Sequence, residues 1–303
     1  MMMFMFSRKK QEEYIQDLTD IARKKSRGRD IWRRLFRNKL GMVGFGIIAL
    51  LVILILFAGV FTKYPYDLQV IGDKWLYPSW KHPMGTDNFG RDLWSRMLYG
   101  GRISMMVALL ATVISAGGGT ILGAVAGYFG GKTDTFITRI LDVLMAVPGL
   151  LLAIAIAFAL GSGPANTALA ISISGIPYSA RLMRATVMTI KSNEYIEAGK
   201  ASGSKNFRII FVHVLPNTIA PLIVNASMWI ADNIMSISGL SFIGLGVQPP
   251  TPEWGAILVA GRPYFRDFWP TIVFPSIFIM LTLFGFNLFG DGLRDALDPR
   301  LKD

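Results

Sequence analysis

The residues best placed to act on another molecule lie in a charged stretch, 194–217, between two long apolar segments. Ser192 or Asn193 can cap a helix there, and Glu194 in its first turn suits the helix dipole. Gly203 has no Cβ atom and permits the left-handed conformation that ends a helix. The pattern predicts a short, water-exposed helix that ends at a glycine turn.

A second helix is expected after this turn. Ser204 can cap it over 205–212, and Pro216 is tolerated in the first turn of the apolar segment that follows. A helix-turn-helix rooted in an apolar helix can transmit a partner's movement. An ordinary loop with two short helices would explain the capping residues equally well, so the caps alone leave both alternatives open.

Residue types that carry catalysis or bind metals are scarce. The chain has no cysteine, which excludes disulfides and thiolate metal sites, and its two histidines, His82 and His213, are far apart. No His-Glu-x-x-His or Gly-x-Ser-x-Gly motif occurs. Gly130-Gly-Lys-Thr133 resembles the end of a phosphate-binding loop, but Gly127 is one residue off the required position. We expect no catalytic, cofactor-binding or metal-binding residues and no ATP binding by this chain.

The elements that must carry the charged stretch are long and apolar. Of the 303 residues, 52% are hydrophobic and 17% charged, and four blocks lack charge altogether: 41–61, 103–131, 143–180 and 268–290. A helix of about 18 or more such residues spans the roughly 30 Å core of a bilayer. The composition predicts an integral membrane protein. The net charge of +11 lies in blocks beside these segments, which favours membrane lipid over nucleic acid as a partner.

We expect an all-α, polytopic bundle with six membrane spans. The expected spans are 41–61, 103–128, 138–160, 166–187, 216–240 and 270–290. Gly161-Ser-Gly-Pro164 supplies the break between the third and fourth spans. In the second span, Gly119, Gly123 and Gly127 suit close helix contact in lipid, where small residues let backbones approach.

The distribution of Lys and Arg favours cytoplasmic N and C termini. With that orientation, the inner segments carry 23 Lys and Arg and the outer segments carry 8. We expect four regions: a basic N-terminal region, 1–40; the first span, an uncleaved anchor, with a long extracytoplasmic loop, 41–102; a core of five spans, 103–290; and a cytoplasmic tail, 291–303. An interfacial helix in the first region would gather on one face Trp32, Leu35, Phe36 and Leu40.

Ionisable residues inside membrane spans are costly and are therefore candidates for function. Asp232 lies about two-thirds along the fifth span, and Asn225, seven residues earlier, shares its side of the helix. We hypothesise that both line a polar pathway. Contact with a neighbouring helix or with the outer headgroups explains them equally well.

Three further charges lie near the inner ends of expected spans. Asp142 follows Arg139 by three residues, which predicts an ion pair within one helix. Arg181 and Arg184 are expected to extend their side chains to the inner membrane surface.

Glu197, Ala198, Gly203 and the pair Leu215-Pro216 together resemble the EAA loop of bacterial ABC importer permeases. In that family the loop is a cytoplasmic helix-turn-helix that docks on an ATP-hydrolysing subunit. A second alanine usual in the family is replaced here by Gly199. The resemblance implies that coupling to the ATPase is carried by Glu197, Ala198, Gly199, Gly203, Leu215 and Pro216.

Three more stretches, 82–104, 240–255 and 290–300, are similar to the C-type permease subunit of oligopeptide, dipeptide and nickel importers. The resemblance runs from about Trp32 to the end of the chain. Relatives often carry an acidic residue just before the second stretch, where Met235-Ser-Ile-Ser-Gly239 has none. A polar contact at that position is therefore not carried over to this chain.

The resemblance implies the rest of a transport machine in a bacterial or archaeal cell membrane. A homologous B-type permease would form the other half of the pathway, two ABC ATPase subunits would hydrolyse ATP, and an extracytoplasmic binding protein would deliver substrate. Di- or oligopeptides are the expected substrates, with nickel or another metal chelate as the alternative. An intramembrane enzyme and an ion-driven secondary transporter are the remote alternatives.

Overall fold

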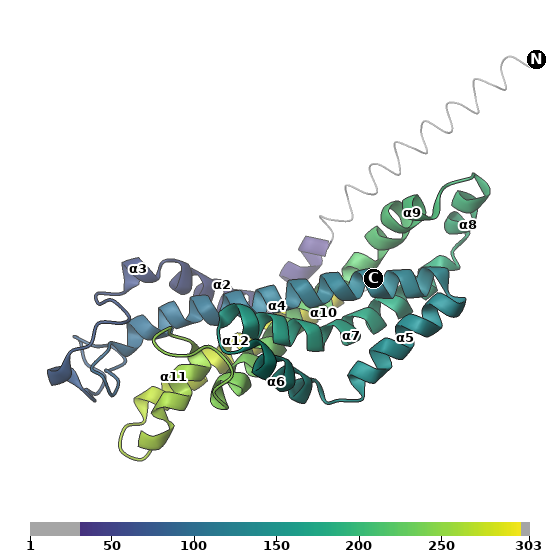
Figure 1. Cartoon of the computed structure of the whole chain (residues 1–303). Helices are drawn as coiled ribbons and strands as arrows, with labels where there is room; N and C mark the ends of the chain where they lie inside the picture. The colour runs from purple at the N-terminus through teal and green to yellow at the C-terminus, as the bar shows by residue number, and fades with distance from the viewer. Residues whose placement is uncertain (1–30, 298–303) are drawn as a thin grey trace, which may run out of the picture.

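The computed structural model describes residues 31–297, and the chain in that range is helical, with an isolated bridge between Thr86 and Asp92 in place of any strand. The long helices are α2 (Lys39–Leu56), α4 (Leu93–Phe129), α7 (Pro164–Lys191), α10 (Leu215–Phe242) and α12 (Pro270–Leu297). The shorter elements are a helix over 31–37, α3 (Ala58–Phe61), η1 (Ile71–Asp73), α5 (Gly131–Met145), α6 (Gly149–Leu160), α8 (Glu194–Ala201), α9 (Asn206–Arg208), the π-helix η2 (Ile209–Val214), α11 (Trp254–Gly261) and η3 (Arg262–Tyr264). The long helices form an elongated bundle (Figure 1).

Four helical runs are long and apolar enough to cross a membrane, namely Lys39–Leu56, Leu93–Phe129, Asn206–Phe242 and Pro270–Leu297. α5 and α6 pass the same test as a pair bent by 85°. The predicted all-helical class with several membrane spans is thereby confirmed for the described residues. α7 has 28 residues but is less apolar, because it carries several serines, two arginines and Pro177.

The predicted single helix over 138–160 is wrong. The chain breaks between α5 and α6, where Pro148 precedes the first residue of α6. Proline lacks a backbone N–H and disfavours the helical conformation in the residue before it, which explains the break. The predicted break at 161–164 is present, with Gly161 and Gly163 at φ of +84° and +137°.

Small residues let two pairs of helices approach closely. On α4, Gly119, Gly123 and Gly127 face α7, and a Cβ atom added at Gly127 would lie only 2.9 Å from the Arg184 carbonyl oxygen. α2 meets α12 in the same way, since a Cβ atom at Gly41 would lie 2.9 Å from the Cα atom of Gly292. Backbone contact of this kind stabilises helix pairs in lipid, where apolar burial gives little driving force.

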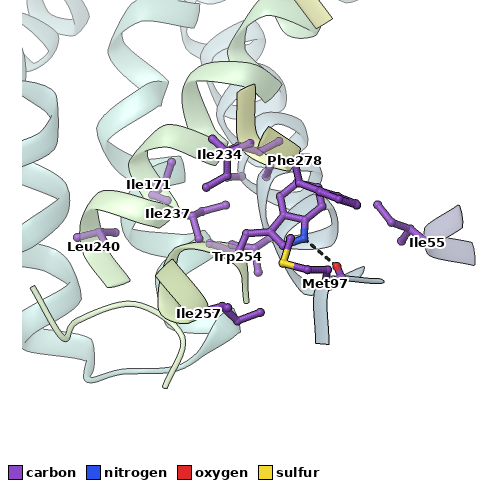
Figure 2. Packing of buried hydrophobic residues seen from close by; sticks show 14 of the residues in the cluster. Ile55, Met97, Ile171, Ile234, Ile237, Leu240, Trp254, Ile257 and Phe278 are labelled. Atoms are coloured by element: carbon purple, nitrogen blue, oxygen red, sulfur yellow. Dashed lines mark hydrogen bonds between the residues drawn. The ribbon is translucent and has the colours of Figure 1, made fainter. Parts of the chain in front are cut away.

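The main hydrophobic cluster lies where α4, α10, α11 and α12 meet. Its centre is the fully buried Trp254, whose indole N–H donates a 2.8 Å hydrogen bond to the Met97 carbonyl (Figure 2). Phe278 of α12 meets the Trp254 ring edge-on at 5.8 Å. This packing fixes the short helix α11 against the ends of the long helices.

The expected apolar face of the first helix is divided. Trp32, Phe36 and Leu40 are exposed, as an interfacial helix requires, and the Trp32 and Phe36 rings lie 5.9 Å apart. Leu35 is buried instead, because it packs next to Gly292 on α12. The same turn is joined to α12 by a 2.9 Å hydrogen bond from the Asn38 amide to Asp295.

Candidate functional site

The coupling segment, defined here as residues 194–216, lies at one end of the bundle, and the loop around α3 and η1 lies at the other (Figure 1). α8 begins after Asn193, whose side chain makes no capping hydrogen bond. The helix ends as predicted, because Gly203 has a left-handed φ of +77°. Glu197 and Ala198 are exposed on α8, and Gly199 is half-buried.

The second half of the coupling segment differs from the prediction. Ser204 does not cap it, because α9 begins only at Asn206, after Lys205. α9, η2 and α10 then follow without a break, so the expected second helix and fifth span form one helical run, Asn206–Phe242. Pro216 lies in the first turn of α10, as predicted.

A small hydrophobic cluster anchors the coupling segment to the bundle. It includes Ile196 of α8 and Ile209 of η2, both buried against Tyr128 at the end of α4. The Tyr128 hydroxyl donates a 2.9 Å hydrogen bond to Asn206, and the Lys200 ammonium lies 5.7 Å from the Tyr128 ring centre. The cluster therefore connects α8 to the end of α4 and, through η2, to the start of α10.

Part of the exposed surface of the coupling segment is apolar. Phe207 and Phe211 are exposed, one helical turn apart, with ring centres 4.3 Å from each other, and Val212 is exposed beside them. The sequence analysis did not single these residues out, although their i, i+4 spacing is a signal that could have found them. A partner that covers this face would bury both rings.

Two ion pairs correct the predictions for the inner ends of the spans. Asp142 does not pair with Arg139 but lies 2.7 Å from Arg181 of α7. Arg184 likewise pairs with Asp134 of α5, through two hydrogen bonds of 2.5 and 2.6 Å. Both arginines therefore connect α5 to α7.

The two candidate pathway residues lie at different cavities. Asp232 lines a cavity of about 250 Å³ between α4, α6, α7 and α10, which we call the Asp232 cavity. Asn225 lines another, of about 460 Å³, together with Arg294 of α12. The amide of Asn225 donates to the Pro221 carbonyl at 2.9 Å. Seven helical residues separate the two side chains by about 10 Å along α10, so they share a face but not a cavity.

Buried carboxylates that the sequence analysis did not identify organise the end of the bundle opposite the coupling segment. Asp92 lies 2.8 Å from the His82 imidazole, and Asp87 lies 2.6 Å from the Arg91 guanidinium. Asp87 lies in the loop before α4, and Asp92 is the residue that caps the first turn of α4. Glu253 caps α11 and is also fully buried. An acidic residue directly before a helix is a capping signal, and it could have identified Asp92 and Glu253.

On the surface of the loop that precedes α4, Lys81 donates a 2.8 Å hydrogen bond to Asp73. The bond lowers the pKa of the Asp73 carboxyl and raises the pKa of the Lys81 amine. Asp73 therefore favours the folded loop at neutral pH, and this contribution disappears as the pH falls through its lowered pKa. The pair is exposed to solvent, which screens it, so its effect on stability is small.

Long apolar helices around a polar cavity, with a water-exposed helical segment at one end, define an integral membrane transport protein. The chain belongs to the family of binding-protein-dependent transport system inner membrane components, whose model matches residues 119–303. Residues 26–78 match the N-terminal transmembrane domain of oligopeptide transport permease C. The resemblance to C-type permeases found in the sequence is thereby confirmed.

Curated relatives match almost the whole chain. It is 43% identical over 274 residues to the dipeptide transport system permease protein DppC of Alkalihalophilus pseudofirmus, covering 90% of each chain. It is 41% identical over 285 residues to the di/tripeptide transport system permease protein DppC of Pseudomonas aeruginosa, covering 91% of this chain and 93% of the relative. The glutathione transport system permease protein GsiD of Pectobacterium atrosepticum is 43% identical over 277 residues, covering 90% of this chain and 91% of the relative.

A solved structure shares the fold. A chain of the inward-facing MetNI methionine ABC transporter superimposes with a TM-score of 0.52 at 15% identity. The match covers 68% of this chain and 98% of the MetNI chain. At this identity the likeness concerns the fold alone.

Proposed function

We propose that this chain is one permease subunit of an ATP-driven importer and forms half of the translocation pathway for di- or oligopeptides. Support comes from relatives at 41–43% identity that transport dipeptides, di- and tripeptides and glutathione by name. A homologous B-type permease forms the other half of the pathway. Two ABC ATPase subunits hydrolyse the ATP, and an extracytoplasmic binding protein delivers the peptide.

The proposed membrane arrangement has six spans with both termini in the cytoplasm. α2, α4, α10 and α12 are four of them, the bent pair of α5 and α6 is the third span in chain order, and α7 is the fourth. α7 serves as a span despite its lower hydropathy, because its serines, Ser172, Ser174 and Ser179, are buried against neighbouring helices. The chain then lies in a bacterial or archaeal cell membrane, with the coupling segment on the cytoplasmic side.

The coupling segment transmits the closure of the ATPases to the pathway. Glu197 and Ala198 offer an exposed helical surface to the ATPase beside the half-buried Gly199, and Gly203 sets the turn to the second half. Leu215 and Pro216 open α10, so displacement of the segment moves α10 directly. The exposed rings of Phe207 and Phe211 enlarge the surface that the ATPase covers.

A Glu197→Lys substitution tests this role in the reconstituted complex. Because Glu197 is exposed, the variant should fold normally but lose about tenfold or more in peptide uptake and in ATPase stimulation by the binding protein. The affinity of the binding protein for peptide should stay unchanged. Asn193→Ala is the matched control, since Asn193 is exposed at the start of α8 and its side chain makes no capping bond.

Normal uptake and normal ATPase stimulation by the Glu197→Lys complex would contradict the coupling role. Purification of the tagged, folded chain without a second permease or an ATPase would contradict the importer itself. Uptake driven by an ion gradient alone would then favour a secondary transporter.

A further inference from the structure

The Asp232 cavity combines a carboxylate with polar atoms from three helices. α4 contributes Ser115, α7 contributes Ser174 and Tyr178, and α10 contributes Asp232, Asn233 and Ser236. The aromatic ring of Trp229 also lines it, one helical turn before Asp232. No lysine, arginine or histidine belongs to the lining.

The serine hydroxyls and the Asn233 amide that line this cavity already donate hydrogen bonds within the protein. Ser115, Ser174 and Ser236 donate their hydroxyl hydrogens to backbone carbonyls at 3.1, 2.8 and 3.0 Å. The Asn233 amide donates to the Thr112 hydroxyl at 2.8 Å. The oxygen atoms of these side chains keep lone pairs that can accept hydrogen bonds from a ligand, in a cavity whose remaining lining includes Leu150, Ala153 and Ile171.

The charge of Asp232 is not balanced within the described chain. Among residues 31–297, no lysine, arginine or histidine nitrogen lies within 4.0 Å of its carboxylate. A carboxylate within a membrane span is costly unless a partner or water compensates it. The cavity thus favours a ligand that carries positive charge and hydrogen-bond donors.

An organic ammonium group satisfies this chemistry better than a metal ion. No group of three His, Asp or Glu side chains suited to a metal occurs in the part of the chain that the structure describes. An ammonium presents three donors and is also attracted to the faces of aromatic rings, here Trp229 and Tyr178. The volume of about 250 Å³ exceeds what a bare ion needs.

We propose that the Asp232 cavity binds the free α-amino group of a peptide as it passes through the pathway. Asp232 provides the counter-charge, and the serine and asparagine oxygens accept the ammonium hydrogens. The proposal rests on the proposed importer function and adds to it a site for the amino end of the substrate. Peptides with a blocked amino group then lack this interaction inside the membrane, whatever the binding protein selects.

The absence of cysteine from the chain permits a direct test of the cavity's charge selectivity. Ser236→Cys is introduced into the assembled complex, in vesicles without ethanolamine lipids, and is modified by a cationic or an anionic methanethiosulfonate of similar size. The cationic reagent should react faster, and adding Asp232→Asn should lower the ratio of the two rates about tenfold, because the carboxylate raises the local cation concentration. Trp80→Cys on the fully exposed outer loop is the control, and its ratio should not change.

The ligand is tested with alanyl-alanine and N-acetyl-alanyl-alanine. The free dipeptide should slow modification of Ser236→Cys, the acetylated one should not, and Asp232→Asn should abolish the difference. An unchanged rate ratio in Asp232→Asn, or equal protection by both peptides, would overturn the proposal while leaving the importer function intact. If neither reagent reaches Ser236→Cys although Trp80→Cys reacts, the cavity is not on the pathway and the proposal fails, whereas the importer function is unaffected.

Discussion

Glu253 joins three helices through one buried carboxylate. Its oxygens accept hydrogen bonds from the Ser104 hydroxyl of α4 and the Ser241 hydroxyl of α10, both at 2.9 Å. They also accept from the first backbone N–H groups of α11, those of Gly255 and Ala256, at 2.9 and 2.8 Å. Four donors converge on one charge, so the residue is both a helix cap and a connection between elements.

Replacement of Glu253 by glutamine should be strongly destabilising. One accepting oxygen becomes an amide that cannot accept from the same hydroxyl and backbone groups, and we expect a loss of about 2 kcal/mol in the free energy of unfolding. Thermal unfolding in detergent measures the effect. Glu194→Gln, at an exposed position on α8, is the control and should unfold like the wild type.

A Glu253→Gln variant that unfolds at the wild-type temperature would show that water or rearrangement replaces these bonds. Residue types alone do not reveal such a connection. The acidic residue before Trp254 signals a cap, but Ser104 lies 149 residues away in the sequence. Only the packing of α11 on α4 brings them together.

α5 and α6 form a bent element that two arginines of α7 hold in place. The pair between Arg184 and Asp134 has two hydrogen bonds, and its side chains are 29% and 18% exposed. The pair between Arg181 and Asp142 has one, and its side chains are 55% and 46% exposed. The first pair is better shielded from solvent and should therefore contribute more.

Asp134→Asn should destabilise the protein by about 1–2 kcal/mol, and Asp142→Asn by about 0.5 kcal/mol or less. Thermal unfolding of the two variants side by side gives the comparison, since both remove one carboxylate from the same helix. Equal losses, or a larger loss for Asp142→Asn, would contradict the assigned difference. Added salt should reduce the effect of Asp142→Asn first.

The elements themselves were largely predictable, but their connections were not. Charge-free blocks long enough to cross a bilayer as helices predicted the long helices. Gly161 and Gly163 correctly predicted one break between helices. The break at Pro148 could have been predicted, because the dipeptide Pro148-Gly149 is a turn signal that the sequence analysis did not use. The ion pairs join residues 50 and 39 positions apart, and they depend on the register of α5 against α7, which local sequence does not encode.

At the scale of the whole molecule, the two exposed ends differ in character. One end carries the coupling segment, anchored by the cluster around Tyr128. The other end carries the loop around η1 and α11, held by Trp254 and the carboxylates near α4 (Figure 1). The motif at the first end was recognisable from its spacing, whereas the Asp232 cavity between the ends required four helices to be placed.

If the two ends lie on opposite sides of the membrane, single cysteines should report it. Ser202→Cys and Trp80→Cys both lie at exposed positions, in a chain without native cysteine. In intact cells a membrane-impermeant maleimide should label Trp80→Cys at once and Ser202→Cys only after the cells are opened. Labelling of both from the same side would contradict the proposed orientation.

The π-helix η2 has a consequence for how the chain can change in length. The N–H of Leu215 donates to the carbonyl of Ile210, five residues back, so each such turn holds one residue more than an α turn. Loss of one residue within η2 can convert the π turn into an ordinary α turn. The helical residues on either side, in α9 and α10, then keep their orientation relative to each other. Loss of one residue elsewhere in α10 rotates everything beyond it by about 100°. Within 206–242, a deletion in η2 therefore keeps the angular position of α9 relative to Asp232.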